Sequence, residues 1–226
     1  MSDDLNVIYY KDCMLDLVEF KNNSVDMVLT DIPYGKVNKP SNGLRELDKK
    51  EANTLDVNLE ELLVELDRIT KNSIVIFCGR EQFSQIYEYF DMKKQGTARP
   101  LIWAKTNPSP MNGQYVYLNG VELAVWYRKP GGTFNAHCKT NVFRFPNGTN
   151  KIHPTQKNLR LFEELILDNT NDGDVVLDPF IGSGTTAVAC MNTGRKFIGY
   201  ENNLEYYNGC MGRIKANDNK RTNQTY

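Results

Sequence analysis

Seven short runs of apolar, β-branched or aromatic residues recur along the chain, each about as long as a buried strand. They occupy residues 6–10, 25–30, 72–78, 99–105, 120–128, 174–180 and 196–201. Several are separated by helical spacing: in 58–70 and in 158–169 the apolar residues recur every three or four positions. Residues 185–194 indicate a further helix that ends at Gly194. Strands that alternate with helices predict an α/β domain with a mostly parallel sheet.

Two stretches depart from this alternation. Residues 35–53 are polar and rich in turn formers, and 106–150, apart from the run at 120–128, are rich in Gly, Pro and Asn. Long irregular segments in a compact domain favour functional loops. The polar residues 217–226 predict a flexible tail. Because 226 residues suffice for one domain with a substantial core, we expect a single domain over 1–226.

Composition narrows the class of protein. No apolar run reaches 18 residues and the N-terminus is acidic, so we expect neither a membrane span nor a signal peptide, and a cytoplasmic location. The five cysteines are odd in number, widely spaced and without a CxxC pair, and there are two histidines. A disulfide framework and a metal site are therefore not expected.

The net charge of −1 hides a basic middle third. Residues 92–160 hold 11 Lys and Arg against one acid, Glu122, whereas residues 1–91 hold 18 acids against 10 basic residues. Such separation indicates a surface for a polyanion, with nucleic-acid phosphate as the usual partner. A basic face that is merely solvated is the alternative.

A glycine turn near the C-terminal end is the most specific local signal. In residues 174–201 a strand ends at Asp178, a loop carries Gly182 and Gly184, a helix follows, and a second strand ends in Glu201. Glycines let a ligand approach the backbone, and the helix N-terminus offers free N–H groups. Glu201, 19 residues after Gly182, can accept hydrogen bonds from two ribose hydroxyls. This unit predicts a cofactor that contains a nucleoside.

Other occupants of the turn stay open. Gly182, Gly184 and Ala187 also satisfy the dinucleotide fingerprint, so a NAD-binding oxidoreductase is one alternative. Only 25 residues follow Glu201, however, so the sheet must be completed by strands from the N-terminal half. A phosphate-binding P-loop is disfavoured because no Gly-Lys-Ser/Thr follows, and a turn without a ligand is the remaining alternative.

Four motifs in one order carry a resemblance to a known family. They are "DIPY" (31–34), "HPTQK" (153–157), "DPFIGSGTT" (178–186) and "IGYE" (198–201). Together they resemble the amino-group DNA methyltransferases of the permuted β subgroup, which use S-adenosylmethionine. The resemblance implies a Rossmann-like domain with a mixed, mostly parallel, seven-stranded sheet in circularly permuted order. It also implies double-stranded DNA as partner, a homodimer, and a restriction-modification setting in a bacterial or phage-infected cell.

The resemblance also implies the residues that hold S-adenosylmethionine. Asp12 would contact the adenine amino group, Glu201 the ribose, and Thr155 and Lys157 the methionine end. The other implied contacts are Asp178, Phe180, Gly182, Gly184, Thr185 and Thr186. Asn158 stands where the family form of the "HPTQK" segment continues with proline, which leaves the start of the next helix open.

"DIPY" supplies the implied catalytic residues Asp31, Ile32, Pro33 and Tyr34. An exocyclic amine is a poor nucleophile because its lone pair is delocalised into the ring. A carboxylate on one amino hydrogen and the Ile32 carbonyl on the other would draw the nitrogen toward sp³ geometry. Ile32 replaces a family proline, but Pro33 still restricts it to extended backbone. Tyr34 would stack on a base rotated out of the duplex.

Two features of the sequence bear on the choice of target base. Methylation of cytosine C5 would need a cysteine after a proline, and the chain has no such pair. The aspartate in "DIPY" resembles adenine-N6 enzymes; cytosine-N4 transfer and a DNA-binding protein without catalysis stay open.

The basic third and the loops supply candidate DNA contacts. For phosphates these are Arg99, Lys105, Arg128, Lys129, Lys139, Arg144 and Lys151, with Lys36 and Lys39 at the mouth of the site. For base edges they are Asn112, Gln114, Tyr115, Tyr117, Asn135 and Asn141.

Overall fold

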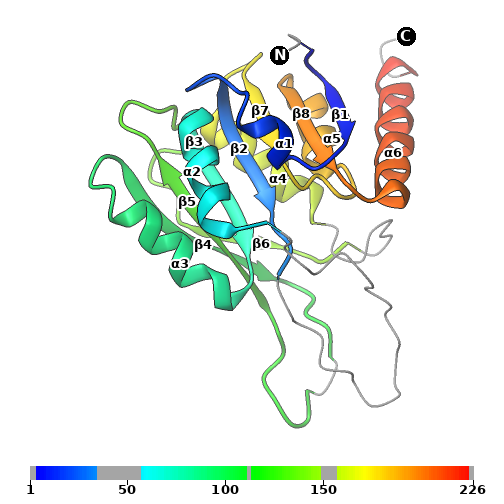
Figure 1. Ribbon diagram of the computed structural model, residues 1–226. Coiled ribbons are helices and arrows are strands. Elements are labelled where there is room, and N and C mark those ends of the chain that lie inside the picture. The colour runs from blue at the N-terminus through cyan, green and yellow to red at the C-terminus, as the bar shows by residue number, and fades with distance from the viewer. Residues whose placement is uncertain (1–3, 35–56, 111–112, 149–156, 224–226) are drawn as a thin grey trace.

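The computed structural model describes residues 4–34, 57–110, 113–148 and 157–223. Its centre is one sheet in the strand order β1-β8-β7-β2-β3-β5-β4-β6 (Figure 1). All of these strands run in one direction except β5, which is antiparallel to both of its neighbours. The strands are β1 (Val7–Tyr10), β2 (Val25–Asp31), β3 (Thr70–Cys78), β4 (Thr97–Lys105), β5 (Val121–Arg128), β6 (Val142–Phe145), β7 (Val175–Asp178) and β8 (Lys196–Glu201).

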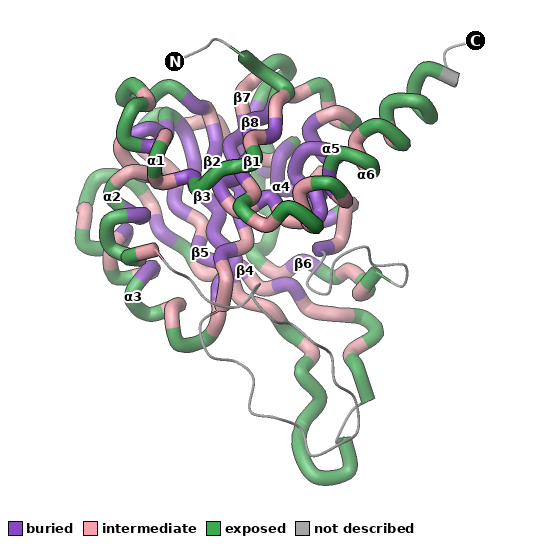
Figure 2. Tube along the Cα trace, turned by 45° about the vertical axis from the view of Figure 1, so that its right-hand side comes forward, coloured by how far each residue is buried: buried purple, intermediate pink, exposed green. Residues whose placement is uncertain are grey.

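Helices cover both faces of the sheet. One face carries α1 (Met14–Leu17), α2 (Leu59–Ile69) and α3 (Arg80–Asp91); the other carries α4 (Leu159–Asn169) and α5 (Thr185–Thr193), with α6 (Leu204–Asn223) beside β1. Alternate residues of β3 serve the two faces: Ile74 and Ile76 pack toward α2, whereas Val75 and Phe77 pack toward α4. Figure 2 shows the result, a buried sheet inside an exposed shell. Burial on both faces explains why the strands read as continuous apolar runs.

The start of α4 answers a question that the sequence left open. Asn158, which replaces a family proline, is the N-cap residue, and its side chain accepts a hydrogen bond from the Leu161 N–H at 3.1 Å. Asparagine is among the best N-cap residues. Asn158 therefore starts α4 in this chain without a proline.

The predicted α/β fold is confirmed, but the predicted count of seven strands is wrong. The eighth strand among the described residues is β6, inside the segment 106–150 expected to form a recognition loop. It holds because Phe143 is buried and because Trp103 Nε1 donates to the Phe145 carbonyl at 2.9 Å. Helix α6 likewise continues through 217–223, where the sequence predicts a tail. The expected loop at 35–53 lies outside the described residues.

The permuted strand order brings distant motifs together. β2 pairs in parallel with β7, and β1 with β8, so the two C-terminal strands lie between two N-terminal ones. As a result Asp31 and Asp178, the last residues of β2 and β7, lie at the same edge, which also carries Glu201 at the end of β8. We call this the carboxyl edge; such an edge is where open α/β sheets bind ligands.

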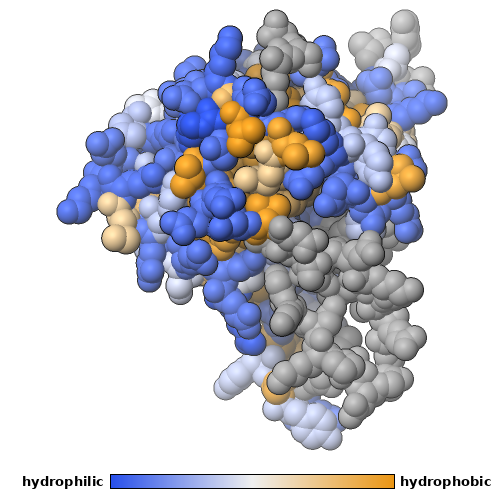
Figure 3. Space-filling model, in the orientation of Figure 1, coloured by the Kyte–Doolittle hydropathy of each residue, from blue (hydrophilic) through white to orange (hydrophobic). Residues whose placement is uncertain are grey.

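The face seen in Figure 3 is mostly hydrophilic, and apolar side chains gather over α1 and α2 on it. Leu15, Val18 and Val64 of this region are each about half exposed. In the described part of the chain no helix has the length and apolar character needed to cross a membrane. The homodimer stays a prediction.

Candidate functional site

Three side chains meet at the end of β2. The Tyr34 hydroxyl donates to Asp31 Oδ1 at 2.7 Å, and Lys157 Nζ lies 2.8 Å from Asp31 Oδ2. Lys157 Nζ also donates to the Tyr34 hydroxyl at 2.8 Å and lies 5.1 Å from the centre of its ring. Lys157 is separated from Tyr34 by 123 residues, so the fold, and not local sequence, assembles this group. Both oxygens of the Asp31 carboxylate thus have a partner.

Glu122, on β5, extends the group into a network that we call the ion-pair chain: Lys105, Glu122, Lys157 and Asp31. Glu122 Oε2 lies 2.6 Å from Lys157 Nζ, and Glu122 Oε1 lies 2.7 Å from Lys105 Nζ. The Lys157 side chain is only 5% exposed. The sequence shows Glu122 as the only acid in the basic third but gives it no role.

The pKa shifts in the ion-pair chain follow from burial and from neighbouring charge. Burial raises the pKa of Asp31, although the positive charge of Lys157 opposes the shift. Burial also acts to raise the pKa of Glu122, but Lys157 and Lys105 outweigh it and hold that pKa at about 2. Burial acts to lower the pKa of Lys157, yet Asp31, Tyr34 and Glu122 keep it well above its usual value. Lys157 and Glu122 are therefore charged at neutral pH, and Asp31 is a strengthened acceptor.

The backbone of "DIPY" is fastened on both sides. The Ile32 N–H donates to the Phe77 carbonyl at 3.1 Å, and the Ile32 side chain is buried. Gln82 Nε2, at the start of α3, donates to the Pro33 carbonyl at 2.9 Å. Gly79 lies against Tyr34, since a Cβ on Gly79 would meet Tyr34 Cβ at 3.3 Å. Gln82 is a positioning residue that sequence reasoning missed, and its spacing from Gly79 at a strand end is the signal that marks it.

The glycine turn between β7 and α5 has the predicted form. Gly184 adopts a left-handed conformation with φ of 75°, and a Cβ there would lie 2.6 Å from Cys210 Sγ of α6. Among the described residues, the nearest heavy atom that a Cβ on Gly182 would meet is the Phe180 carbonyl oxygen, at 3.9 Å, so these residues leave space open there. Arg213 of α6 donates from Nη1 to the Ser183 carbonyl at 2.9 Å and to Thr185 Oγ1 at 2.9 Å. The C-terminal helix thus braces the turn.

Asp178 connects the turn to the strand of Asp31. Its Oδ1 accepts from Thr30 Oγ1 at 2.8 Å and from the Phe180 N–H at 3.1 Å, and its Oδ2 accepts from Thr186. The side chain is buried, and burial raises its pKa to about 7. The structure therefore shows Asp178 and Thr186 bonded within the chain, where they fix β7, α5 and β2 relative to one another.

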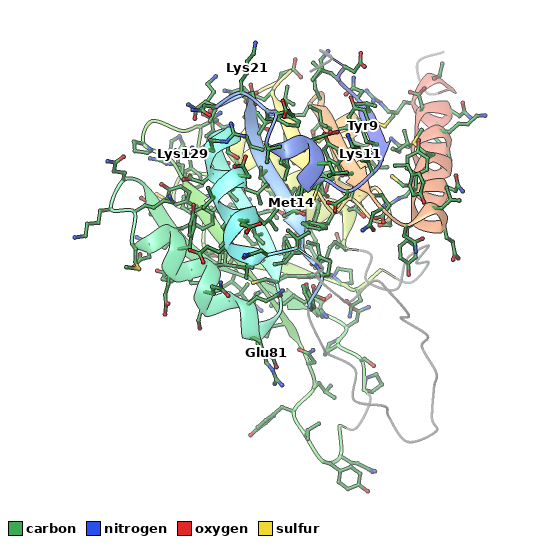
Figure 4. All side chains as sticks on the ribbon, viewed as in Figure 1. Tyr9, Lys11, Met14, Lys21, Glu81 and Lys129 are labelled. Atoms are coloured by element: carbon green, nitrogen blue, oxygen red, sulfur yellow. The ribbon has the colours of Figure 1, made fainter. Side chains whose placement is uncertain are left out.

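Glu201 and Asp12 lie side by side on the other flank of the turn. Glu201 Oε2 accepts from the Gly182 N–H at 3.0 Å, and the Lys11 N–H donates to the Glu201 carbonyl at 3.0 Å. Asp12 is exposed, and its Oδ1 accepts from the Met14 N–H at 2.9 Å. Figure 4 labels Lys11, just after β1, and Met14, at the start of α1; Lys11 pairs with Asp16. The Glu201 carboxylate therefore lies against the Gly182 backbone, and Asp12 follows the strand that pairs with β8.

The candidate DNA contacts divide between the two ends of the sheet. Gln114, Tyr115 and Tyr117 are exposed on the loop that leaves the carboxyl edge after β4, and Arg144 of β6 is exposed. Others are used within the fold: Lys129 pairs with Asp67, Lys139 with Glu164 and Asp168, Asn135 Nδ2 donates to the Thr170 carbonyl, and Asn141 Nδ2 to the Pro100 carbonyl. Figure 4 shows Lys129 at the opposite end of the sheet from Glu81, which follows β3 at the carboxyl edge.

Arg99 and Arg128 lie at the same end of the sheet as Lys129, opposite the carboxyl edge. Arg99 is near the start of β4, and Arg128 is the last residue of β5, which runs antiparallel to β4. The second half of the expected recognition segment 106–150, which follows Arg128, therefore begins at the end of the sheet opposite Asp31. Lys36, Lys39, Asn112, Lys151 and Thr155 lie outside the described residues. Within the part of the chain that the structure describes, no group of three or more Asp, Glu, His and Cys is placed to hold a metal ion.

Comparison with known families decides the class of this site. The profile of a DNA methylase family, which groups N6 and N4 methylases, matches residues 25–211. The chain belongs to this DNA methylase family. Its match spans "DIPY", the glycine turn and Glu201, so the resemblance found from four motifs is confirmed.

Two relatives match the methylase over most of their length. The Type II methyltransferase M2.DpnII of Streptococcus pneumoniae is 26% identical, with 93% of this chain and 90% of the relative covered. The Type II methyltransferase M2.MboI of Moraxella bovis is 28% identical, with 91% and 86% covered.

Solved structures agree with the fold. The complex of M1.HpyAVI with S-adenosylmethionine superposes with a TM-score of 0.74 at 27% identity, covering 92% of this chain and 98% of the other. The cytosine-N4-specific PvuII DNA methyltransferase reaches a TM-score of 0.71 at 19% identity, covering 92% and 85%, which shows the fold alone.

Proposed function

We propose that this methylase transfers a methyl group from S-adenosylmethionine to the exocyclic N6 amine of adenine in double-stranded DNA, at a specific site. The observation that carries the proposal is the place of Asp31: a carboxylate with a raised pKa, at the carboxyl edge, one strand from the glycine turn. Family membership and the Type II relatives support DNA as substrate, and the bacterial relatives support a restriction-modification role in the cytoplasm of a bacterial or phage-infected cell.

The residues at the carboxyl edge fit S-adenosylmethionine. Open space beside Gly182 admits a ligand against the backbone, and the Glu201 carboxylate has acceptor capacity for ribose hydroxyls. Exposed Asp12, close to Glu201, can accept from an adenine amino group. The similar structure of M1.HpyAVI is a complex with S-adenosylmethionine. When bound, S-adenosylmethionine supplies an electrophilic methyl group.

Asp31 and the Ile32 carbonyl act on the target amine. Each accepts one amino hydrogen, which draws electron density onto the nitrogen and frees its lone pair. The Asp31 oxygens already accept from Tyr34 and Lys157, but a carboxylate oxygen has two lone pairs and can accept again. As the nitrogen–methyl bond forms, the sulfur–methyl bond breaks and the sulfur becomes neutral, and the Asp31 carboxylate takes the proton that the methylated amine loses and passes it to water. Holding two reactants in line accounts for much of the rate, so the fastened backbone of residues 31–34 contributes directly.

Tyr34 supports the flipped base. Its ring lies at the carboxyl edge, half-buried between Gly79 and Lys157. Stacking on an aromatic ring is worth roughly 1–3 kcal/mol per base, which offsets part of the cost of unstacking. The exposed side chains of Gln114, Tyr115 and Tyr117 are placed on the same edge to hold the remaining duplex.

The choice of base is tested by digesting methylated DNA to nucleosides. The expected product is N6-methyldeoxyadenosine, because the acid in "DIPY" is typical of adenine enzymes. N4-methylcytosine in its place would refute the adenine assignment and leave the site chemistry standing.

The role of Asp31 is tested by Asp31→Ala and the near-isosteric Asp31→Asn. Loss of an acceptor aimed at developing charge costs about 10²–10³ in rate, so methyl transfer should fall by at least that factor. Affinity for S-adenosylmethionine should stay within a few-fold. Asp67→Asn is the matched control, since Asp67 pairs with Lys93 and Lys129 away from the site. Full activity of Asp31→Ala would exclude the mechanism.

A further inference from the structure

We propose that Glu122 is a positioning residue of the methyl-transfer site, which holds Lys157 against Asp31 and Tyr34 and keeps the ion-pair chain electrically neutral. The inference rests on the proposed function, because it concerns how that same site accommodates a cationic methyl donor. Glu122 belongs to none of the four motifs, and it is the only acid between residues 92 and 160. Each of its carboxylate oxygens is taken by a different lysine.

Glu122 is held in place by two paired strands. Lys105 is the last residue of β4, Glu122 is the second residue of β5, and the two strands pair antiparallel. The Lys105 N–H also donates to the Gly120 carbonyl at 2.7 Å, which closes the stem of the loop between the strands. Lys157, by contrast, comes from the segment just before α4 and reaches the site with a long, flexible side chain. The position of Glu122 therefore sets the position of the Lys157 ammonium group.

Lys157 has no spare donor in this arrangement. Its three N–H groups have three partners: Asp31 Oδ2, the Tyr34 hydroxyl and Glu122 Oε2, at 2.6–2.8 Å. An ammonium group has three donors, so all are satisfied. Without the bond to Glu122, the ammonium is free to rotate away from Asp31 and Tyr34, the two side chains that must receive the target base. Glu122 thus acts on the target amine through Lys157.

The ion-pair chain is also balanced in charge. Two carboxylates alternate with two ammonium groups, and the four side chains are 5–19% exposed. Removing one member of a buried network leaves an uncompensated charge that water screens poorly. The methyl donor carries a positive sulfonium, which must lie close to the amine that Asp31 holds, whereas the product S-adenosylhomocysteine has a neutral sulfur. A neutral ion-pair chain therefore tolerates the sulfonium cation, whereas one extra positive charge in the ion-pair chain would weaken binding of the methyl donor.

The decisive measurement is the ratio of the dissociation constants of S-adenosylmethionine and S-adenosylhomocysteine, by isothermal titration calorimetry on the full chain. The two ligands differ by the methyl group and its charge, so a general loss of structure cancels from the ratio. Glu122→Gln leaves one excess positive charge and a carboxamide that can accept from only one lysine. We expect it to raise the ratio on the order of tenfold, from one unit charge within about 10 Å at an effective dielectric constant of about 20.

Two further variants keep the test sharp if Glu122→Gln folds poorly. Lys105→Met removes the opposite charge, so it should lower the ratio, and the double variant Lys105→Met/Glu122→Gln should return it to the wild-type value. The matched control is Glu164→Gln, which breaks the ion pair with Lys139 on α4 and should leave the ratio unchanged. A ratio that stays constant in both single variants would overturn the electrostatic part of the proposal.

The positioning part has its own readout. In Glu122→Gln, kcat for methyl transfer should fall while KM for DNA holds, since Glu122 reaches the DNA base only through Lys157. In the double variant the ratio recovers but kcat stays low, because neutrality is restored without the anchor. Recovery of kcat in the double variant would refute positioning. Failure of the proposed function would look different: the wild-type protein would methylate no DNA, while the ratio shifts would still be measurable.

Discussion

Replacement of Asp178 by asparagine should stabilise the protein at neutral and higher pH. Asp178 is buried between β7, α5 and β2, and its pKa is raised by burial to about 7. Asparagine has the same shape and carries no charge. Its carbonyl oxygen can keep the bonds from Thr30 and from the Phe180 N–H, and the Thr186 hydroxyl can rotate to accept from the amide.

The size of the effect follows from the pKa. A carboxyl with a pKa of about 7 in the folded state and about 3.8 when unfolded favours folding most when it is protonated. That stabilisation is fully present below about pH 4 and is lost as pH rises through about 7, for a total of about 4 kcal/mol. Of this, about 2–3 kcal/mol falls between pH 5 and pH 8. The variant lacks this component, so its advantage over the wild type should grow by that amount across the interval.

Urea unfolding of both proteins at several pH values provides the assay. The relevant quantity is the difference in free energy of unfolding between variant and wild type, because other titrating groups cancel from it. A difference that is independent of pH would refute the reasoning, since it would mean that Asp178 is ionised without cost in the folded protein.

Two further substitutions test how the site is held. Ile32→Pro introduces the family residue but should lower the free energy of unfolding by about 2 kcal/mol or more, because the N–H bonded to the Phe77 carbonyl and a buried side chain are lost; an unchanged urea midpoint would contradict this. Arg213→Met removes the donors to Ser183 and Thr185. The dissociation constant for S-adenosylmethionine should therefore rise roughly fivefold, which corresponds to about 1 kcal/mol, while Lys215→Met, at an exposed position of the same helix, serves as the control.

Most of the sheet could be predicted from the sequence, since strands covered on both faces leave apolar runs. The permuted order could be predicted as well, because "DIPY" precedes the glycine turn along the chain. β6 was missed because four residues with a charged Arg144 among them have no pattern of their own. Its stability comes from Trp103 and from pairing with β4, which are properties of the assembled sheet.

The site divides in the same way. Asp31, Gly182, Gly184 and Glu201 each belong to a motif, so the sequence alone is enough to propose them as site residues. Glu122 and Gln82 could not be assigned roles, because each acts through a partner distant in sequence: Lys157 in one case and Pro33 in the other. Lys157 was expected at the methionine end, and its bond to the Asp31 carboxylate depends on how α4 approaches β2.

The departure at Ile32 is explained by these distant partners. In the family pattern two consecutive prolines limit the backbone after the catalytic acid, whereas this chain has one. Here the Phe77 carbonyl holds the Ile32 N–H and Gln82 holds the Pro33 carbonyl, so hydrogen bonds to β3 and α3 replace the second ring as the constraint. A proline at position 32 could not make the first of these bonds. Ile32 is therefore compatible with a rigid site because the neighbouring strand and helix supply the rigidity, and the proposed role of the Ile32 carbonyl needs no second proline.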